Sequence, residues 1–384
     1  MKISSLQATP VSVPTLRPCA WSQGTGYGST RTILEVTTGD GLVGLGECEG
    51  PEAATVLNGW LGKKLQGLSI HDIGQARALC RMGFRDYGSL ANNTLIQCYA
   101  AVEMALWDLI GKKAGAPVFA LLGGAVRERA EFGAYAYSFE LDTAGMREQD
   151  VPDAMARVAA EAIVRTGART FEFKVGRFSE ETDIETIRAV RAALGDRIVL
   201  GVDANMAYDL DRTRRVLRAV EAARLDWFEE PVASLVEMQR LSQEFPVRLS
   251  SHCTDLEKLP LYPGIEGSVG DLHFQGGLLG VAREAAALRS QGRRFWQRSS
   301  LELGVSWAAM VHLGISCPDL GRDSQSLIDW VEDDLVQGAP WLLKDGGRIP
   351  PERPGLGVEL DRAALDRYAE AFRARGEFTY FDGP

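Results

Sequence analysis

The second half of the chain repeats one pattern, in which a short apolar or β-branched segment precedes an amphipathic helical segment. Segments of the first kind occupy 131–138, 170–175, 197–205, 225–231, 247–253, 268–274 and 293–300. We interpret them as strands, and strands that alternate with helices form parallel sheets with crossover connections. A weaker candidate for an eighth strand lies at 326–330.

A polar residue stands at the carboxyl end of most of these predicted strands. The residues are Lys174, Asp203, Glu229, Ser250, Asp271 and Arg298, spaced by 29, 26, 21, 21 and 27 positions. This regular spacing favours a closed barrel over an open sheet with two unequal halves. In such a barrel the polar strand ends converge on one mouth, where the reactive groups of the fold are found.

The first 130 residues have a different pattern of apolar and polar positions, typical of an α+β unit. Alternating segments at 2–13 and 32–37 predict strands, and the triplet 39–41 (Gly-Asp-Gly) predicts a hairpin turn. The intervening segment 18–31 is rich in Gly, Ser and aromatic residues, and we interpret it as a loop that could close over a site. Apolar residues at helical spacing predict a helix at 92–111.

Composition narrows the function classes. The 384 residues carry a net charge of −10, which repels nucleic acid and anionic membranes, so we expect neither as a partner. No run approaches the roughly 20 apolar residues that span a bilayer. The six cysteines form no CxxC pair and the start of the chain has no signal-peptide pattern, so we expect a soluble, cytoplasmic protein with reduced thiols.

Two carboxylates at consecutive strand ends, Asp203 and Glu229, suggest a metal site. Like charges in a dry barrel mouth repel unless a cation joins them, and oxygen ligands suit Mg²⁺. Each could instead be a buried carboxylate bonded to backbone or to an arginine. Lys174, one strand earlier, could take a proton from the carbon next to a carboxylate, or could simply be an internal salt-bridge partner.

Several segments in order resemble the enolase superfamily, in its mandelate racemase and glucarate dehydratase branch. The segments are RTILEVTTGDGLVGLGE, AAVEMALWDLIGKKAGAPVFALLGG, FKVG, VDAN, FEEP, GDLHFQGGL, SSLELGVSWAAMVH and PERPGLGVELD. The resemblance implies a modified TIM barrel, (β/α)7β, with an α+β N-terminal capping domain, Mg²⁺, and abstraction of a proton α to a carboxylate. We place the capping domain at 1–128, the barrel at 129–350, and a segment returning to the capping domain at 351–384.

The resemblance also implies roles for individual residues. Asp203 and Glu229 match metal ligands, Asn205 matches a polar substrate contact, Lys174 matches the second lysine of a KxK motif, and Asp271 matches the aspartate of an Asp and His dyad. Three positions depart from the family: Glu172 replaces the first lysine, Ser250 or Ser251 falls on the third metal ligand, and Arg298 falls on the dyad histidine. Arginine cannot lose a proton at working pH, so the second acid/base is absent from its usual place.

The period of a strand suggests how the changes compensate. Glu172 shares a face with Lys174, so we expect it to favour the protonated lysine and to pair with Arg298 across the mouth. By the same period His252 shares a face with Ser250 and could be a substitute metal ligand, an acid, or a residue behind the site. Arg31 and Tyr27 in the predicted loop could hold a substrate. Glu302 matches a family glutamate but could equally be a helix N-terminal acid.

These observations predict a Mg²⁺-dependent lyase of the acid-sugar dehydratase type. It would remove the α-proton of a small carboxylate, most simply a sugar acid, and eliminate the β-hydroxyl, slowly and with an alkaline optimum. One alternative is a racemase or epimerase of a hydroxy or amino acid derivative, which needs a base on each face and is weakened by Arg298. Another is a barrel that binds a sugar acid without turning it over. We expect a homo-oligomer.

Overall fold

The chain begins with a three-stranded antiparallel sheet. The computed structural model describes residues 1–81, 90–141, 145–338 and 343–379, and not the side chains of 90–92. The strands, in sheet order, are β1 (Ile3–Trp21), β2 (Gly24–Thr38) and β3 (Val43–Glu49). The predicted turn at 39–41 is present, since Thr38 N donates to Leu42 O and Gly41 adopts a φ of 85°, which glycine tolerates.

The segment 18–31 belongs to these strands, so its prediction as a loop is wrong. Trp21 pairs with Gly24, and Cys19 pairs with Gly26. The hairpin is held by partners far away in the sequence: Ala20 forms a bridge with Ser138, and Ser22 Oγ donates to the carbonyl of Ala204. The local composition cannot reveal these long-range partners. The hairpin tip consequently lies against the barrel.

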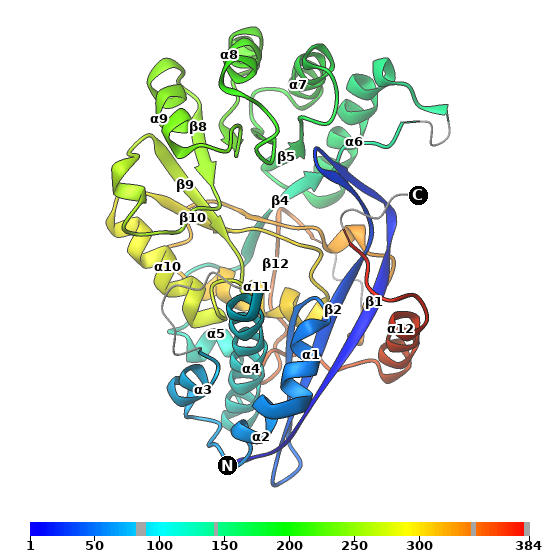
Figure 1. Ribbon diagram of the computed structural model, residues 1–384, viewed down its shortest axis with the longest axis vertical. Helices are drawn as coiled ribbons and strands as arrows, with labels where there is room; N and C mark the ends of the chain where they lie inside the picture. The colour runs from blue at the N-terminus through cyan, green and yellow to red at the C-terminus, as the bar shows by residue number, and fades with distance from the viewer. Residues whose placement is uncertain (82–89, 142–144, 339–342, 380–384) are drawn as a thin grey trace.

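Helices cover one face of the sheet (Figure 1). They are α1 (Glu52–Val56), η1 (Leu57–Leu61), α2 (Gly62–Leu65), α3 (Ile73–Leu79), α4 (Leu90–Ala114) and α5 (Val118–Leu121). The long helix α4 packs closely on β3 because Gly44 and Gly46 expose bare backbone there. A Cβ atom at either glycine would collide with the carbonyl oxygens of Ala105 and Ala101. This explains the VGLG pattern of the third strand.

The remaining strands form a nearly closed barrel of parallel strands (Figure 1). They are β4 (Ala130–Ala136), β5 (Thr170–Lys174), β6 (Val199–Asp203), β7 (Trp227–Glu229), β8 (Arg248–Ser251), β9 (Ile265–Gly270), β10 (Arg294–Gln297) and β11 (Ser324–Gln325). Neighbours pair in chain order from β4 to β10, and β11 pairs with β4. At the open side, a parallel bridge joins Phe295 of β10 to Leu320, in the segment that precedes β11. The predicted fold class is confirmed.

The predicted eighth strand at 326–330 is wrong. β11 consists of only Ser324–Gln325, and Ile328–Trp330 forms a 3-10 turn (η6). Trp330 is buried in this turn and its Nε1 donates to the carbonyl of Tyr135. An apolar run of this length fits either state, and here the tertiary contact decides it.

Helices follow most of the strands and cover the barrel; most are amphipathic, but α11 is buried along its whole length. They are α6 (Val151–Thr166), α7 (Glu180–Leu194), α8 (Leu210–Ala219), α9 (Leu235–Glu244), α10 (Leu278–Ser290) and α11 (Gly304–Ser316), with short 3-10 turns η3 (Glu148–Asp150), η4 (Glu221–Ala223) and η5 (Leu259–Leu261). In the described ranges, no helix has both the length and the apolar character needed to cross a bilayer.

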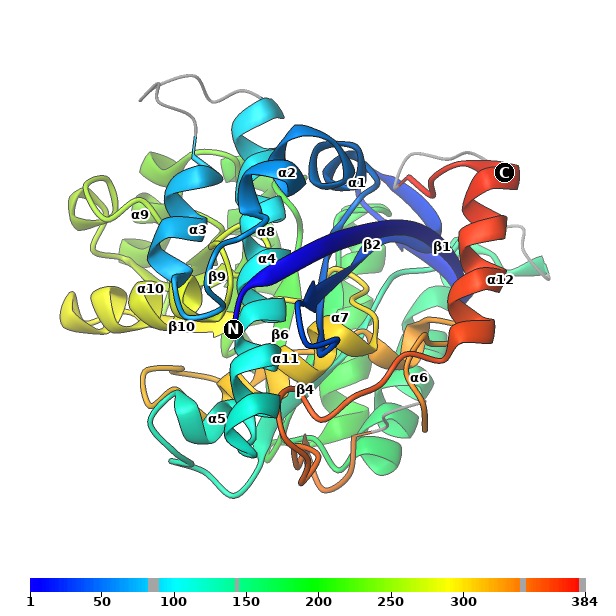
Figure 2. The same ribbon diagram turned by 90° about the horizontal axis from the view of Figure 1, so that it is seen from below.

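The C-terminal segment runs back to the first sheet. The helix α12 (Arg362–Arg375) lies beside β1, so that β1 and β2 pass between α4 and α12 (Figure 2). Arg362 forms an ion pair of 2.5 Å with Glu35, and Phe378 N donates to Thr30 Oγ1 over 2.7 Å. Before this helix, β12 (Gly347–Arg348) pairs with the start of β4. Residues 380–384 of the predicted returning segment lie outside the described residues.

Two buried carboxylates of the first unit cap the N-termini of barrel helices. Glu47 on β3 accepts hydrogen bonds from Leu303 N and Ser306 N at the start of α11, each over 2.9 Å. Glu103 on α4 accepts from the backbone N–H groups of Leu278 and Leu279 at the start of α10. Each carboxylate satisfies N–H groups that have no partner within their helix, and it complements the helix dipole. The caps fix the sheet over the barrel mouth.

Candidate active site at the barrel mouth

Polar side chains from most barrel strands and from the capping sheet meet at the carboxyl ends of the strands. They enclose a cavity of about 130 Å³. It is lined by Trp21, Glu49, Tyr135, Tyr137, Lys174, Asp203, Asn205, Glu229, His252, Arg298, Ser299, Ser300, Gln325 and Leu327. The structure thus brings the predicted residues Lys174, Asp203, Asn205, Glu229, His252 and Arg298 to one place.

Strand register places Lys174 beside Asp203 and Asp203 beside Glu229. Lys174 Nζ lies 2.6 Å from Asp203 Oδ2, and the hydroxyl of Tyr135 donates to the same oxygen over 3.2 Å. The other oxygen, Oδ1, accepts from Asn205 N over 2.8 Å. This last bond needs a positive φ of 48° at Asn205, a conformation that Asn tolerates better than most residues.

Aromatic rings surround the ammonium group of Lys174. Its Nζ lies 5.6 Å from the ring centre of Trp21, 5.5 Å from that of Tyr135 and 5.9 Å from that of Tyr137. Ring faces carry partial negative charge and attract cations. The ammonium group thus contacts three aromatic rings and one carboxylate, that of Asp203. These contacts hold it at the cavity, beside the carboxylates.

The site holds more negative than positive charge near Glu229. Burial raises the pKa of Glu229 well above its usual value, and the nearby carboxylates of Asp203 and Glu172 raise it further, while Lys174 and Arg322 partly offset them. Gln325 Nε2 donates to Glu229 Oε2 over 3.1 Å. A cation placed between Asp203 and Glu229 would relieve this repulsion.

The candidates for a third metal ligand occupy different positions. Ser250 is buried and does not line the cavity, and Ser251 Oγ donates to Glu230 over 2.7 Å. His252 does line it, with Nε2 3.6 Å from Glu229 Oε1 and Nδ1 3.6 Å from Glu230 Oε1. No three His, Cys, Asp or Glu side chains among the described residues are arranged to hold a metal. The donors fit Mg²⁺, which commonly takes one or two protein carboxylates and keeps several waters.

Glu172 and Arg298 are not a reciprocal pair, so that prediction is wrong. Glu172 Oε2 accepts from Arg322 over 2.8 Å and its Oε1 accepts from Gln325 over 2.6 Å, deeper in the barrel. Arg298 instead forms a 2.6 Å ion pair with Asp271. The compensating cation, Arg322, precedes β11, whose place in the barrel the sequence did not reveal. The charge that meets Lys174 is that of Asp203 and not that of Glu172.

The carboxylate of Asp271 contacts Arg298 and the backbone of the loop after β9. Its Oδ1 accepts from His273 N and Phe274 N, each over 2.8 Å. Burial alone would raise the pKa of Asp271, but Arg298 and His273 together with these N–H groups hold it below its usual value. Asp271 therefore stays ionised and fixes Arg298, which presents a permanent positive charge to the cavity.

The structure adds an acidic group that the sequence reasoning missed. Glu49 stands at the end of β3, in the capping sheet, and lines the cavity. Its Oε2 is buried and makes no hydrogen bond to any described residue. Burial raises the pKa of Glu49, although Arg31 and Arg298 oppose the rise. The sequence did contain one signal for this residue. Glu49 follows Glu47 by two positions on a predicted strand, so both side chains lie on the same face of that strand.

Three predicted substrate contacts do not reach the cavity. Arg31 is completely buried, where its Nε donates to Glu47 over 2.9 Å and Nη2 lies 2.5 Å from His273 Nε2, so its predicted role in holding a carboxylate is wrong. Tyr27 donates its hydroxyl to Glu140 over 2.8 Å. Glu302 accepts from Ser299 Oγ and from Ser300 N, and so shapes the cavity wall from behind.

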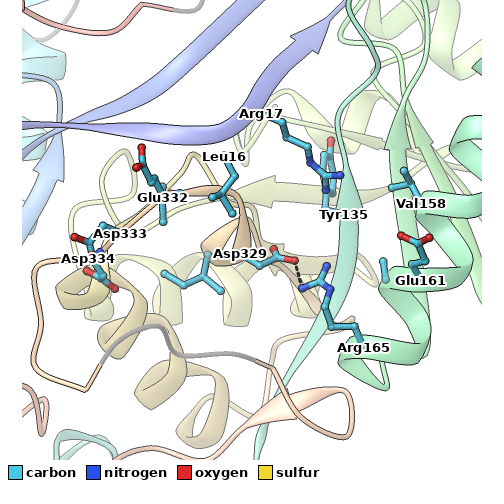
Figure 3. Close-up of a pocket in the computed structure, with 13 residues that line it drawn as sticks. Leu16, Arg17, Tyr135, Val158, Glu161, Arg165, Asp329, Glu332, Asp333 and Asp334 are labelled. Atoms are coloured by element: carbon cyan, nitrogen blue, oxygen red, sulfur yellow. Dashed lines mark hydrogen bonds and ion pairs between the residues drawn. The ribbon is translucent and has the colours of Figure 1, made fainter. Parts of the chain in front are cut away.

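A separate cavity of about 460 Å³ lies on the other side of Tyr135, between β1, α6 and the segment 328–334 (Figure 3). Some of its charged groups have partners within the protein. Arg165 is paired with Asp329, and the guanidinium of Arg17 lies 3.9 Å from the ring centre of Trp330. Tyr135 is thus a wall between this cavity and the one that contains Lys174.

Comparison with known families agrees with this architecture. The family model described as "Enolase C-terminal domain-like" matches residues 154–364, and "Mandelate racemase / muconate lactonizing enzyme, N-terminal domain" matches residues 5–123. The chain belongs to the enolase superfamily. The resemblance noted in the sequence motifs is therefore confirmed.

Relatives within the superfamily match over nearly the whole chain. A probable glucarate dehydratase of Streptomyces coelicolor is 28% identical, with 95% of this chain and 90% of the relative covered. The crystal structure of an enolase from the same organism superimposes with a TM-score of 0.88 at 29% identity, covering 98% and 99% of the two chains. An enolase from Thermobispora bispora, complexed with magnesium and formate, has a TM-score of 0.86 at 29% identity, covering 98% and 94%.

Proposed function

We propose that this superfamily member is a Mg²⁺-dependent dehydratase of a sugar acid. It removes the proton α to the carboxylate and eliminates the β-hydroxyl, leaving a keto acid. The observation that carries the proposal is the contact of Lys174 with Asp203, beside Glu229, in a cavity closed by both domains. The similarity to a probable glucarate dehydratase and to an enolase with bound magnesium and formate supports it.

Asp203 and Glu229 would hold the metal, with His252 able to add a ligand. When bound there, Mg²⁺ would offset the negative charge that develops on the substrate carboxylate as the α-proton leaves. The surplus of carboxylates around Glu229 is the feature of this chain that favours such a cation. Water and the substrate would complete the coordination, since Mg²⁺ rarely relies on protein ligands alone.

Lys174 is the base in this proposal. Among the described residues, Lys174 is the only lysine that lines the cavity, and its amine can reach the α-proton of an acid held at the carboxylates. Arg298 holds a carboxylate or hydroxyl of the substrate on the opposite wall, and Asn205, whose buried Oδ1 has no hydrogen-bond partner among the described residues, accepts from a substrate hydroxyl.

In this proposal Glu49 is the general acid, a role that the family's Asp and His dyad would otherwise fill. A departing hydroxyl must be protonated, and Arg298 cannot give up its proton at working pH. Burial raises the pKa of Glu49 and so favours its protonated form, which is the form that can donate a proton. Elimination therefore uses one base on the barrel and one acid on the capping sheet. The same two groups would also serve an epimerase, if Glu49 returned a proton to the α-carbon.

Solvent deuterium exchange over a library of sugar acids separates these reactions. Keto acid formation that Lys174→Ala abolishes supports the dehydratase, with Lys113→Ala, on the exposed end of α4, as the matched control. Exchange with inverted configuration and no keto acid would instead establish the epimerase. Binding of Mg²⁺ and acids without exchange or product at any pH would leave only a binding protein, and the catalytic proposal would fail.

A further inference from the structure

Gln325 connects the proposed metal position to the barrel interior behind it. It lies on β11, paired with Gly133 of β4, and it lines the cavity although it is only 8% exposed. Its Nε2 donates to Glu172 Oε1 over 2.6 Å and to Glu229 Oε2 over 3.1 Å. Its Oε1 accepts from Ser299 N over 3.4 Å. Turning the amide over would set its oxygen against two carboxylates, so the orientation of the amide is fixed.

An ion pair fixes the Glu172 end of this bridge. Arg322 and Glu172 are 2.8 Å apart, and their side chains are only 6% and 3% exposed. The guanidinium also lies 5.4 Å and 4.9 Å from the ring centres of two tryptophans. Gly201 on β6 provides the space for the pair, because a Cβ atom there would lie 2.9 Å from Glu172 Oε2. In so crowded an interior Glu172 is a rigid anchor for the amide of Gln325.

The bridge holds Glu229 at one of its two oxygens. Gln325 engages Oε2, while Oε1 lies 3.6 Å from Nε2 of His252, whose ring also lines the cavity. Glu229 is itself only 2% exposed, so its carboxylate has little room to turn. An ion in the cavity therefore meets one oxygen of Glu229, namely Oε1, as long as the hydrogen bond from Gln325 is intact.

The second candidate ligand, Asp203, is restrained in a similar way. Its Oδ2 contacts Lys174 Nζ and accepts from the hydroxyl of Tyr135, and its Oδ1 accepts from Asn205 N. Ca²⁺ takes six to eight oxygen ligands and often binds both oxygens of a carboxylate. Mg²⁺ is smaller, requires nearly ideal octahedral geometry and keeps several waters. Carboxylates that are held at one or both oxygens therefore suit Mg²⁺ better than Ca²⁺.

We propose that Gln325 is a positioning residue that makes this site select Mg²⁺ over Ca²⁺. By holding Oε2 of Glu229, it prevents that carboxylate from binding an ion through both oxygens. Without the amide, Glu229 would be able to turn about its last side-chain bond and chelate the larger ion. The inference rests on the proposed function for the place of the metal, and it does not depend on which reaction the site performs.

Calorimetric titration of the metal-free chain with Mg²⁺, and separately with Ca²⁺, tests this role. Gln325→Met keeps the length of the side chain and removes both donors. Loss of a hydrogen bond that orients a metal ligand commonly costs about 10- to 100-fold in affinity. We expect the Mg²⁺ affinity to fall by about tenfold or more while the Ca²⁺ affinity holds or rises. A merely structural role would weaken the binding of both ions alike.

Gln239→Met is the matched control. Gln239 is a partly buried glutamine on α9, and its Oε1 accepts from Gly264 N away from the cavity. This variant should keep the wild-type ratio of Mg²⁺ to Ca²⁺ affinity. If Gln325→Met does not fold, Gln325→Asn takes its place, since its amide is one methylene too short to reach both carboxylates, and the ratio should fall in the same direction.

The outcomes separate this inference from the proposed function. If the wild type binds Mg²⁺ and the variant at Gln325 keeps the wild-type ratio of affinities, or loses both ions equally, the inference is overturned and the metal site stands. If the wild type binds neither ion, the metal is removed from the proposed function and the inference fails with it. A ratio that falls at least tenfold in the variant at Gln325, and not in Gln239→Met, establishes the role.

Discussion

Acid should weaken the junction between the barrel and the capping domain through His312. This residue lies on α11 with its ring buried, and its Nδ1 accepts from Phe119 N of α5 over 3.3 Å. Nε2 lies 3.1 Å from the carbonyl of Leu356, to which it can donate. A neutral ring satisfies both contacts, but a protonated one would turn a donor toward Phe119 N. Burial accordingly lowers the pKa of His312 from 6.5 to about 4.

The size of the effect follows from this shift. The folded state binds the proton less readily than the unfolded state, so the stability contributed by neutral His312 is complete above pH 6.5 and is lost as the pH falls toward 4. One pKa unit corresponds to about 1.4 kcal/mol, which gives about 3 kcal/mol in total. By the same linkage, about 2 kcal/mol of this is already lost at about pH 5.

Urea unfolding at pH 8 and pH 5, followed by tryptophan fluorescence, measures this loss. We expect His312→Gln to be less stable than the wild type at pH 8, because a buried N–H or carbonyl loses its partner. Its free energy of unfolding should then fall by about 2 kcal/mol less than that of the wild type on going to pH 5. The control His71→Gln, at an exposed position, should behave as the wild type. Equal pH dependence of the wild type and His312→Gln would refute the reasoning.

Variants of the proposed active site give three further expectations. Asp203→Asn removes a carboxylate from the metal position and should weaken Mg²⁺ binding by about tenfold or more in calorimetry; unchanged affinity would remove Asp203 from the site. Glu49→Gln cannot supply a proton, so keto acid formation should fall by about 10²- to 10⁴-fold while deuterium exchange at the α-carbon persists; parallel loss of both would mean that Glu49 does not act as the acid. Glu172→Gln leaves Arg322 buried without its anionic partner and should lower the free energy of unfolding by about 3–5 kcal/mol in urea titrations; a change within experimental error would show that the pair is not needed for stability.

The sequence predicts the barrel well because its strands are short, apolar and regularly spaced. It also predicts which side chains meet, since parallel strands place Lys174, Asp203 and Glu229 side by side at their carboxyl ends. These inferences need only local patterns and the geometry of a parallel sheet. The same geometry fails for Ser250 and Asp271, which do not line the cavity, and for Glu172, which pairs with Arg322 and not with Arg298.

Contacts between distant segments could not be predicted in this way. Gln325 sits on a strand of two residues, too short to leave a periodic pattern, although it contacts both Glu172 and Glu229. Glu49 reaches the cavity from another domain, and only the position of the capping sheet brings it there. Arg31 is polar and follows a glycine-rich segment, which is typical of a surface loop. It is nevertheless buried, because it forms an ion pair with the buried Glu47.

The caps that Glu47 and Glu103 place on α11 and α10 have a consequence for how new specificities could arise. Each carboxylate lies in the first domain, and the helix N-terminus that it caps lies in the barrel. Replacing one domain by that of another protein would therefore leave a buried carboxylate or a helix N-terminus without its partner. A chimera with a relative's first domain should fold only if acids occupy both positions. Variation in substrate preference is then easiest at the hairpin tip around Trp21, where residues can change while the two domains keep their alignment.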